Sequence, residues 1–432
     1  MGQADSDFEP VAAAPSLLRR DGDPDTYCVC SKATCDGVCS SLARYCPVCG
    51  DPVDFDATYA SALQSSGVLA ASQPVGEPAK LDLSRFGARN ILYMKRYKGF
   101  LLLGTEGAGL LVLNIAKPSG MNAQQFLAGE SVHSVIEPPG NDARQVYLVT
   151  HSGVHILDFL PHPSTHKLAD LELDAQRAGA PIAFLAFISA GPVVFEPLSN
   201  EGPTRLTLVP NDGSERSVAE VPGVASRPVG TKDGGFAFFT ASAVYVCPPD
   251  SMDFTEYPAR DSLDSREQLH RMHVSDSCFI VPASHDLRLF DTSSGTLNPF
   301  GPDLKEPYLL ASGWDRPWIV AIDQEGVKVI EARTGASLGD SRSQLNFPMS
   351  KLDVLPLLGT NRVFFVALMR NGASQLVVVP LTLEGRVDST KGAISLLSIG
   401  FAATGIMASP SGILVAEVSP RGCSLTRVGV AS

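Results

Sequence analysis

The chain has 432 residues, of which 44% are hydrophobic and 19% are charged, and its formal net charge is −12. The apolar content is sufficient for a large globular core, whereas the acidic balance argues against nucleic acid or an anionic membrane as a partner, since both are bound mainly through Lys and Arg. No run of about 18 apolar residues predicts a membrane span, and the opening MGQADSDFEP lacks the parts of a secretory signal. We therefore expect a cytoplasmic protein.

Six of the nine cysteines lie between residues 28 and 50. They are Cys28, Cys30, Cys35, Cys39, Cys46 and Cys49. The last pair, in CPVCG, has the spacing of a zinc knuckle, because two thiolates two residues apart chelate one ion from a tight turn. Cys28 with Cys30, Cys30 with Cys35, or Cys35 with Cys39 would complete a four-sulfur site, and six sulfurs would also hold two ions.

Residues 27–52 thus resemble a zinc ribbon, although no C-x2-C occurs among the first four cysteines. The resemblance implies a structural zinc ion, since four thiolates leave no open position for a substrate. Metal ligation worth about 10–16 kcal/mol would replace the core that so short a segment lacks. A disulfide framework and an iron–sulfur cluster are the alternatives. We interpret residues 1–26 as a disordered tail and residues 53–79 as a linker.

From residue 80 onward, pairs of short apolar runs joined by turns recur every 39 to 50 residues. The pairs begin at Phe100, Val146, Val193, Phe236, Phe279, Trp318, Val363 and Ile413. Each pair has a further run before it and a polar run after it, as with MHVSD and TLNPF in the fifth unit. Four strands per unit at this period are typical of a β-propeller.

The stretch LRLFDTSSGT resembles the third strand and turn of a WD repeat, with Phe290 and Asp291 where Trp-Asp is usual. VKVIEARTGA resembles it more faintly, and the Gly-His dipeptide of that family is missing from every unit. The resemblance covers residues 80–432 and implies a WD-repeat-like architecture with degenerate repeats. We predict an all-β, eight-bladed propeller, with KLDLSRF (80–86) as the outer strand of the last blade. Seven blades is the alternative if VVFEPLSNEG is an insertion.

The sequence shows no nucleophile elbow and no phosphate-binding loop. Four histidines in THSGVHILDFLPHPSTH are interpreted as exposed loop residues rather than as a metal site: His151, His155, His162 and His166. The glycines of GTEGAG are interpreted as turn residues of a hairpin. We expect Cys247, Cys278 and Cys423 to be small buried hydrophobic residues. We expect Trp314 and Trp318 to pack in the core or at the rim.

We therefore predict a non-catalytic scaffold or adaptor, in which the propeller face and the zinc module each bind protein partners, including those of a multi-subunit complex. One alternative is an enzyme, a hydrolase or lyase, with a site at the propeller channel, since propellers assemble such sites from distant strands. The other is a nucleic-acid adaptor acting through the zinc ribbon. Acidic residues on both sides of the ribbon argue against it.

Overall fold

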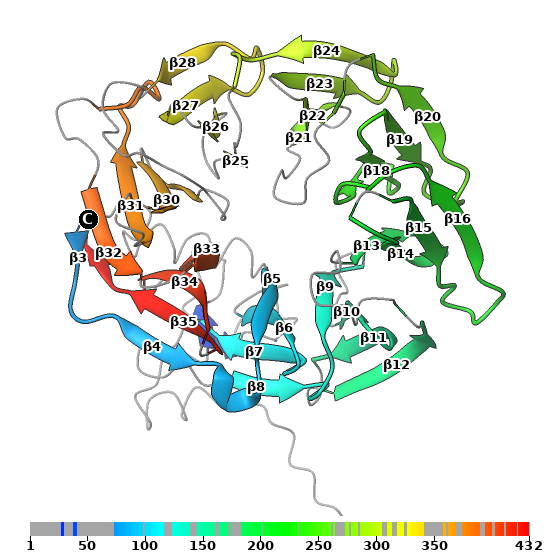
Figure 1. Cartoon of the computed structure of the whole chain (residues 1–432), viewed down its shortest axis with the longest axis horizontal. Helices are drawn as coiled ribbons and strands as arrows, with labels where there is room; N and C mark the ends of the chain where they lie inside the picture. The colour runs from blue at the N-terminus through cyan, green and yellow to red at the C-terminus, as the bar shows by residue number, and fades with distance from the viewer. Residues whose placement is uncertain are drawn as a thin grey trace, which may run out of the picture.

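The computed structural model describes residues 27–29 and 38–40 and, apart from gaps between strands, residues 73–431. Eight four-stranded sheets follow one another around a ring (Figure 1). Apart from one short 3-10 turn, the described elements are strands. The prediction of an all-β, eight-bladed propeller is confirmed. Among the described residues, no helix has the length and hydrophobicity to cross a bilayer.

The first four blades are each formed by four consecutive strands. Blade 1 consists of β5 (Asn90–Tyr97), β6 (Phe100–Glu106), β7 (Leu110–Asn114) and β8 (Ala123–Phe126). Blade 2 consists of β9 (Val132–Ile136), β10 (Gln145–Thr150), β11 (Gly153–Asp158) and β12 (Ser164–Asp170). Blade 3 consists of β13 (Phe184–Ile188), β14 (Gly191–Pro197), β15 (Thr204–Leu208) and β16 (Ser217–Val221). Blade 4 consists of β17 (Val229–Gly230), β18 (Phe236–Phe239), β19 (Ala243–Cys247) and β20 (Thr255–Pro258).

The next three blades have the same order, and the last takes its fourth strand from the start of the ring. Blade 5 consists of β21 (His273–Ser275), β22 (Cys278–Pro282), β23 (Leu287–Asp291) and β24 (Thr296–Phe300). Blade 6 consists of β25 (Leu309–Ser312), β26 (Trp318–Asp323), β27 (Gly326–Glu331) and β28 (Ser337–Asp340). Blade 7 consists of β29 (Leu357–Gly359), β30 (Arg362–Leu368), β31 (Ser374–Pro380) and β32 (Ile394–Ile399). Blade 8 consists of β33 (Ala402–Ser409), β34 (Gly412–Ser419), β35 (Gly422–Val428) and β4 (Ala79–Asp82).

The apolar runs of the sequence form the two middle strands of each blade. In blade 3, β14 is buried at every position, whereas the outer strand β16 is mostly exposed. Neighbouring blades cover both faces of the middle strands, so these strands need no polar alternation. The alternative of seven blades is wrong, because VVFEPLSNEG is not an insertion. It supplies most of β14 and the turn that leads to β15, and both strands belong to the complete sheet of blade 3.

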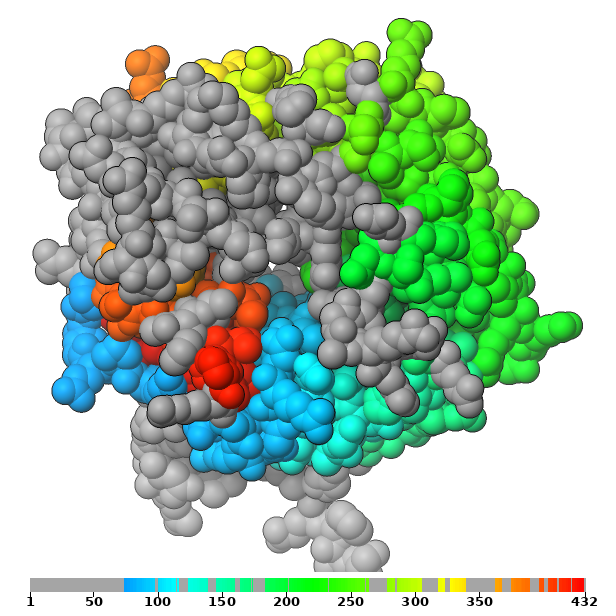
Figure 2. Space-filling view, in the orientation of Figure 1, coloured from blue at the N-terminus to red at the C-terminus, as the bar shows by residue number. Residues whose placement is uncertain are grey.

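The core is divided among the contacts between successive blades. Between blades 3 and 4, for example, Phe195 packs edge-on against Phe236 and Phe238, with ring centroids 5.6 and 5.1 Å apart. Edge-on pairs are a preferred aromatic geometry and contribute stability beyond that gained by burying the rings. Comparable clusters lie at the other contacts around the ring. In the space-filling view, blades 1 to 4 accordingly pack against one another without a break (Figure 2).

The ring is closed by strands from both ends of the described segment. β4 pairs antiparallel with β35, with Leu81 opposite Leu425, so the predicted closing strand is confirmed. It ends at Asp82 rather than at residue 86, because Ser84 donates its backbone N–H to the Asp82 carboxylate and begins the 3-10 turn η3 (Ser84–Phe86). A second pair, β3 (Gln73–Pro74) with β36 (Val430–Ala431), extends the closure.

Candidate functional site

The predicted zinc module is described only in part. β1 (Tyr27–Val29) and β2 (Val38–Ser40) form a two-stranded antiparallel sheet in which Cys28 lies opposite Cys39 in the backbone register. The backbones of two predicted ligands are therefore adjacent. The other four, Cys30, Cys35, Cys46 and Cys49, lie outside the described residues, and zinc ligation stays a prediction.

The histidines of the 151–166 stretch occupy different environments. His151 begins the turn between β10 and β11, His155 lies on β11, and His166 is exposed on β12, while His162 is outside the described residues. The interpretation as exposed loop residues is wrong for His155, which is only 6% exposed, because its strand is covered by neighbouring blades. Within the described part of the chain, no three His, Cys, Asp or Glu side chains converge closely enough to hold a metal ion.

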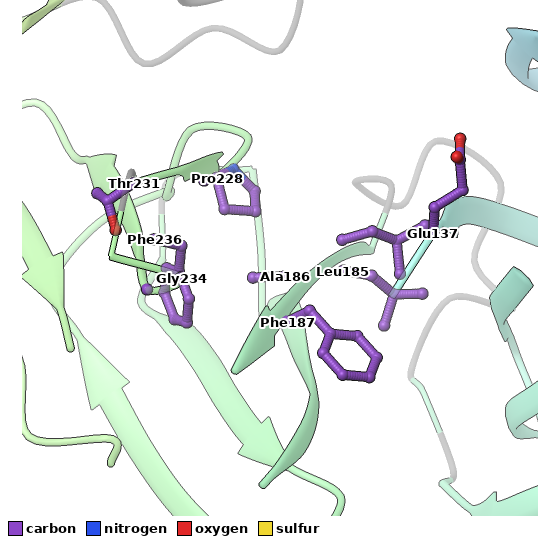
Figure 3. A pocket seen from close by; sticks show the side chains of 11 residues that line it. Glu137, Leu185, Ala186, Phe187, Pro228, Thr231, Gly234 and Phe236 are labelled. Atoms are coloured by element: carbon purple, nitrogen blue, oxygen red, sulfur yellow. The ribbon is translucent and has the colours of Figure 1, made fainter. Parts of the chain in front are cut away.

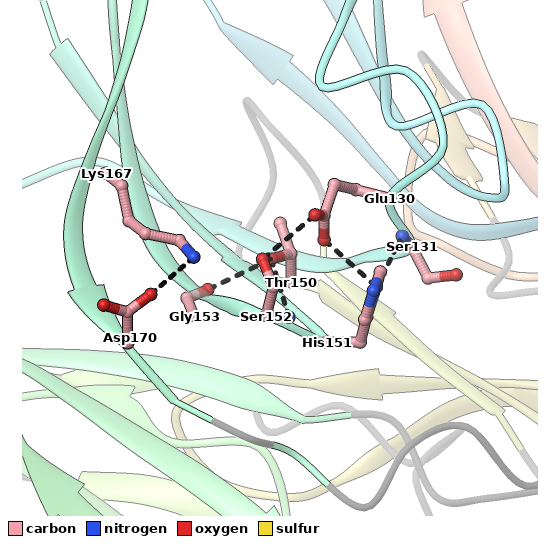
Figure 4. A network of polar contacts seen from close by, with 8 residues as sticks. All are labelled: Glu130, Ser131, Thr150, His151, Ser152, Gly153, Lys167 and Asp170. Carbon is pink, nitrogen blue, oxygen red and sulfur yellow. Dashed lines mark hydrogen bonds and ion pairs between the residues drawn. The ribbon is translucent and has the colours of Figure 1, made fainter.

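A polar network surrounds the turn between β10 and β11 (Figure 4). Glu130 is its centre: one carboxylate oxygen accepts a hydrogen bond from Ser152 Oγ at 3.0 Å, and the other lies 3.0 Å from His151 Nδ1. The Ser131 N–H also approaches His151 Nδ1, at 3.3 Å. His151 Nδ1 accepts this hydrogen bond, and the facing Glu130 Oε2 is buried without a hydrogen-bond partner among the described residues. The two groups therefore lie within contact distance without a hydrogen bond between them.

Backbone contacts with blade 1 position Glu130 over blade 2. The turn between β6 and β7 lies against the connection from β8 to β9: Gly109 N–H donates to the Glu130 carbonyl, and Gly129 N–H donates to the Gly107 carbonyl. Gly107 and Gly109 both have positive φ, which confirms GTEGAG as a hairpin turn. A Cβ on Gly109 would lie 2.1 Å from the carbonyl oxygen of Phe126. The two connections therefore approach as closely as glycine permits.

Two further histidines near this network are buried. Neither ring nitrogen of His133, on β9, and not Nε2 of His155 has a hydrogen-bond partner in the described structure. Burial, with a smaller contribution from nearby His151, lowers the pKa of His133 from 6.5 to about 4. Burial also lowers the pKa of His155. Both side chains are therefore neutral at pH 7.

A second recess, the axial pocket, opens where the inner strands of blades 2, 3 and 4 approach one another (Figure 3). Its volume is about 200 Å³. Leu185, Ala186 and Phe187 of β13 lie between Glu137 on one side and Thr231 on the other. The pocket is thus largely apolar, with a carboxylate at its edge.

Charged and aromatic side chains join the inner strands around this pocket. Glu137 forms an ion pair of 3.0 Å with Lys95 of β5. The Arg227 guanidinium lies over the rings of Phe184 and Tyr93, at 5.0 and 5.6 Å from their centroids. Tyr93 in turn donates its hydroxyl to the Val135 carbonyl of β9. These contacts connect blades 1, 2 and 3 on the inner side of the ring.

Four residues of these sites were not predicted from the sequence: Glu130, His133, Glu137 and Arg227. They lie on the inner strands or in the connections that lead into or out of them. The one available signal was a polar residue within or beside a short apolar run, as in VHSVIE. That signal is weak, because many strand ends and loops carry such a residue. Cys247 and Cys423 are buried as predicted, and burial raises their pKa to about 12 and 11. Trp318 is buried between blades, whereas Cys278 is half-buried.

The fold defines the class of protein as an eight-bladed β-propeller. No protein-family model matches the chain, and no curated protein matches it. The WD-repeat and zinc-ribbon resemblances therefore have no support from a family. Among solved structures, the crystal structure of the computationally designed Ika8 protein covers 79% of this chain and 96% of its own, with a TM-score of 0.50 and 14% identity. A likeness at this identity shows the fold alone.

Proposed function

We propose that the ring is a protein-interaction scaffold and that the axial pocket is one of its docking points. Propellers commonly serve as such scaffolds, but many functions occur on one fold, so the site must carry the argument. The supporting observation is the set of apolar side chains at the pocket, namely Leu185, Phe187 and Phe236. They present an apolar recess on the inner side of an otherwise acidic protein.

The size of the pocket favours a single side chain as its occupant. Pockets for small molecules usually measure about 300–1,000 Å³, whereas the axial pocket measures about 200 Å³. Its lining comes largely from the inner strands of blades 2, 3 and 4, so little additional ordering of the protein is required when a partner binds. Glu137 at its edge is already paired with Lys95, so the apolar side chains are the main basis for recognition.

Gly230, which lines the pocket, offers a way to fill it. A Cβ at this position would meet only the Gly235 carbonyl oxygen, at 4.0 Å, and its φ is not in the left-handed region. Gly230→Leu therefore extends a side chain into the pocket without backbone strain. Gly230→Ala is the matched control, because it changes the backbone in the same way and fills much less space.

The test compares tagged wild-type, Gly230→Leu and Gly230→Ala proteins in quantitative mass spectrometry of co-purifying proteins from native lysate. We expect stoichiometric partners with the wild type and Gly230→Ala, and a loss of at least one of them with Gly230→Leu. The scaffold proposal fails if no partner is retained by wild type. The assignment to the axial pocket fails if all three proteins retain the same set.

One observation favours a second candidate function, an acid–base enzyme. An imidazole, His151, and a carboxylate, Glu130, lie 3.0 Å apart at the turn between β10 and β11, and side chains of these two types act as general acids and bases in enzymes. Assay of ester and lactone hydrolysis, with His151→Gln as the variant, tests this candidate. Wild-type turnover that His151→Gln abolishes would support it over the scaffold, whereas equal background rates would remove it.

A further inference from the structure

A larger recess, the rim groove, lies between the outer strands of blades 4 and 5. Its volume is about 500 Å³. β20, β23 and β24 supply most of its lining, and the two outermost strands, β20 and β24, follow one another along the outside of the ring (Figure 1). The rim groove and the axial pocket share no lining residue. Only the blade 4 residues of the axial pocket are close to the groove in the sequence.

Two half-buried side chains, Tyr257 and Leu297, supply apolar surface to the groove. Beneath them, Val244, Leu263 and Phe290 belong to the core cluster between blades 4 and 5 and are almost fully buried. An apolar side chain placed in the groove would pack on Tyr257 and Leu297 and lose its contact with water.

The charge of the groove is opposite to that of the whole chain. None of the described residues that line it is acidic, whereas Arg260 and Arg288 are both present. Asp286 binds Arg288 through both of its carboxylate oxygens, at 3.2 and 3.0 Å. Arg260 is exposed, and no described carboxylate pairs with it. Arg260 therefore supplies a positive charge that its described neighbours do not neutralise, on a chain of net charge −12.

Proline restricts how a partner can dock at this rim. β20 ends in Pro258 and β24 contains Pro299, and both line the groove. Because proline has no backbone N–H, these outer strands are poor templates for an added β-strand. The Thr296 and Asn298 side chains are hydrogen-bonded to each other at 3.2 Å. Recognition at this rim would therefore depend on side chains rather than on strand addition.

We propose that the rim groove binds an acidic peptide segment of a partner protein, with an aromatic side chain on the apolar floor and a carboxylate on Arg260. The aromatic ring matches the apolar surface of Tyr257 and Leu297 that forms the floor. The carboxylate matches the Arg260 guanidinium, with which no described carboxylate pairs, since planar pairing with carboxylates is characteristic of Arg. This site is additional to the axial pocket and would bind its peptide whether or not the axial pocket binds a partner.

The test measures fluorescence anisotropy of a fluorescein-labelled hexapeptide of alternating glutamate and phenylalanine, titrated with the full chain in 0.05 M NaCl. We expect saturable binding that weakens in 0.5 M NaCl, because an exposed ion pair is screened. Arg260→Ala should weaken binding about two- to fivefold, as expected for one exposed ion pair. Arg260→Glu should weaken it more than about tenfold, because like charges then face each other.

Controls separate the groove from general charge effects. Arg333→Ala removes another exposed arginine, in the turn after β27 of blade 6, and should leave the affinity unchanged. A peptide with glutamine in place of glutamate should bind wild type and Arg260→Ala equally. Gly230→Leu should also bind the acidic peptide normally, so failure of the axial pocket and failure of the rim groove give different results.

Three results would overturn the proposal. One is the absence of saturable binding to wild type. Another is equal affinity for wild type and Arg260→Glu. The third, from light scattering, is a wild-type dimer that Arg260→Glu converts to a monomer, since the groove would then be an interface between two copies of the chain.

Discussion

Blades 2 and 8 have the same four-stranded form but different origins in the chain. Blade 2 is one continuous segment, from β9 to β12, whereas blade 8 combines β33–β35 with β4. Contacts at the closure consequently join distant residues: Cys423 Sγ donates to the Ala88 carbonyl at 3.6 Å across a separation of 335 positions. A continuous blade forms from local hairpins, whereas blade 8 requires the two ends of the ring to meet. The stability of the closed ring should therefore depend strongly on residues 73–82.

Deletion of residues 1–82 should have the largest effect on this comparison. It removes β3 and β4, leaves the edge of β35 unpaired and uncovers the cluster that includes Leu81. We expect the free energy of unfolding to fall by about 5 kcal/mol or more, from lost burial and strand hydrogen bonds. Urea denaturation against a deletion of residues 1–72, which keeps both strands, measures the difference. Equal midpoints would show that the closing strands contribute little.

A glycine pair in blade 1 tests how far a continuous blade depends on its own turns. Gly109 and Gly129 both have positive φ, but a Cβ on Gly109 would lie about 2.1–2.2 Å from two backbone carbonyl oxygens, whereas Gly129 has nothing within 4 Å. We expect Gly109→Ala to lower the free energy of unfolding by about 3 kcal/mol or more and Gly129→Ala by about 1 kcal/mol. Similar urea midpoints for the two variants would contradict the close approach of the two connections.

Acid should affect blade 2 through His133, whereas the strands of blade 8 contain no histidine. The folded pKa of His133, about 4, is below its unfolded value of 6.5, so the unfolded chain binds more protons between these values. Stability is therefore fully present above about pH 6.5 and falls as the pH approaches 4, by about 3 kcal/mol in total.

Urea denaturation between pH 7 and 4.5 measures this loss. His133→Leu should reduce the dependence of stability on pH, whereas His166→Leu, at an exposed position, should leave it unchanged. An identical pH dependence in wild type and His133→Leu would rule out the buried imidazole as the cause.

The double substitution Cys46→Ser and Cys49→Ser should have the smallest effect on the ring. We propose that these thiolates help to hold a structural zinc ion in the N-terminal module, so the variant should lose zinc in elemental analysis. The melting of the propeller should change by less than about 0.5 kcal/mol in free energy, because the substituted residues precede the closing strands. Loss of the whole fold would show that the module and the ring are one cooperative unit.

The repeat of apolar hairpins predicted the class of fold and eight blades, with seven as the alternative that only the structure excluded. Strand pairs such as β22 and β23 carry their own turn signals and continuous apolar runs, so local sequence determines them. KLDLSRF was recognised as the closing strand because the last repeat lacked an outer strand. The second closing pair, β3 with β36, had no such signal, since two residues carry no periodicity.

The candidate sites depended instead on how the blades are placed around the ring. Glu130 meets His151 because a turn of blade 1 supports the connection into blade 2. Leu185 and Gly230 line one pocket although they belong to different blades, and Arg260 and Arg288 do the same at the rim. Hydrophobic periodicity reports which residues are buried within a strand, but it carries no information on which blades are neighbours in space. Composition and pattern therefore determined the strands, and only the packing of one blade against the next created the recesses.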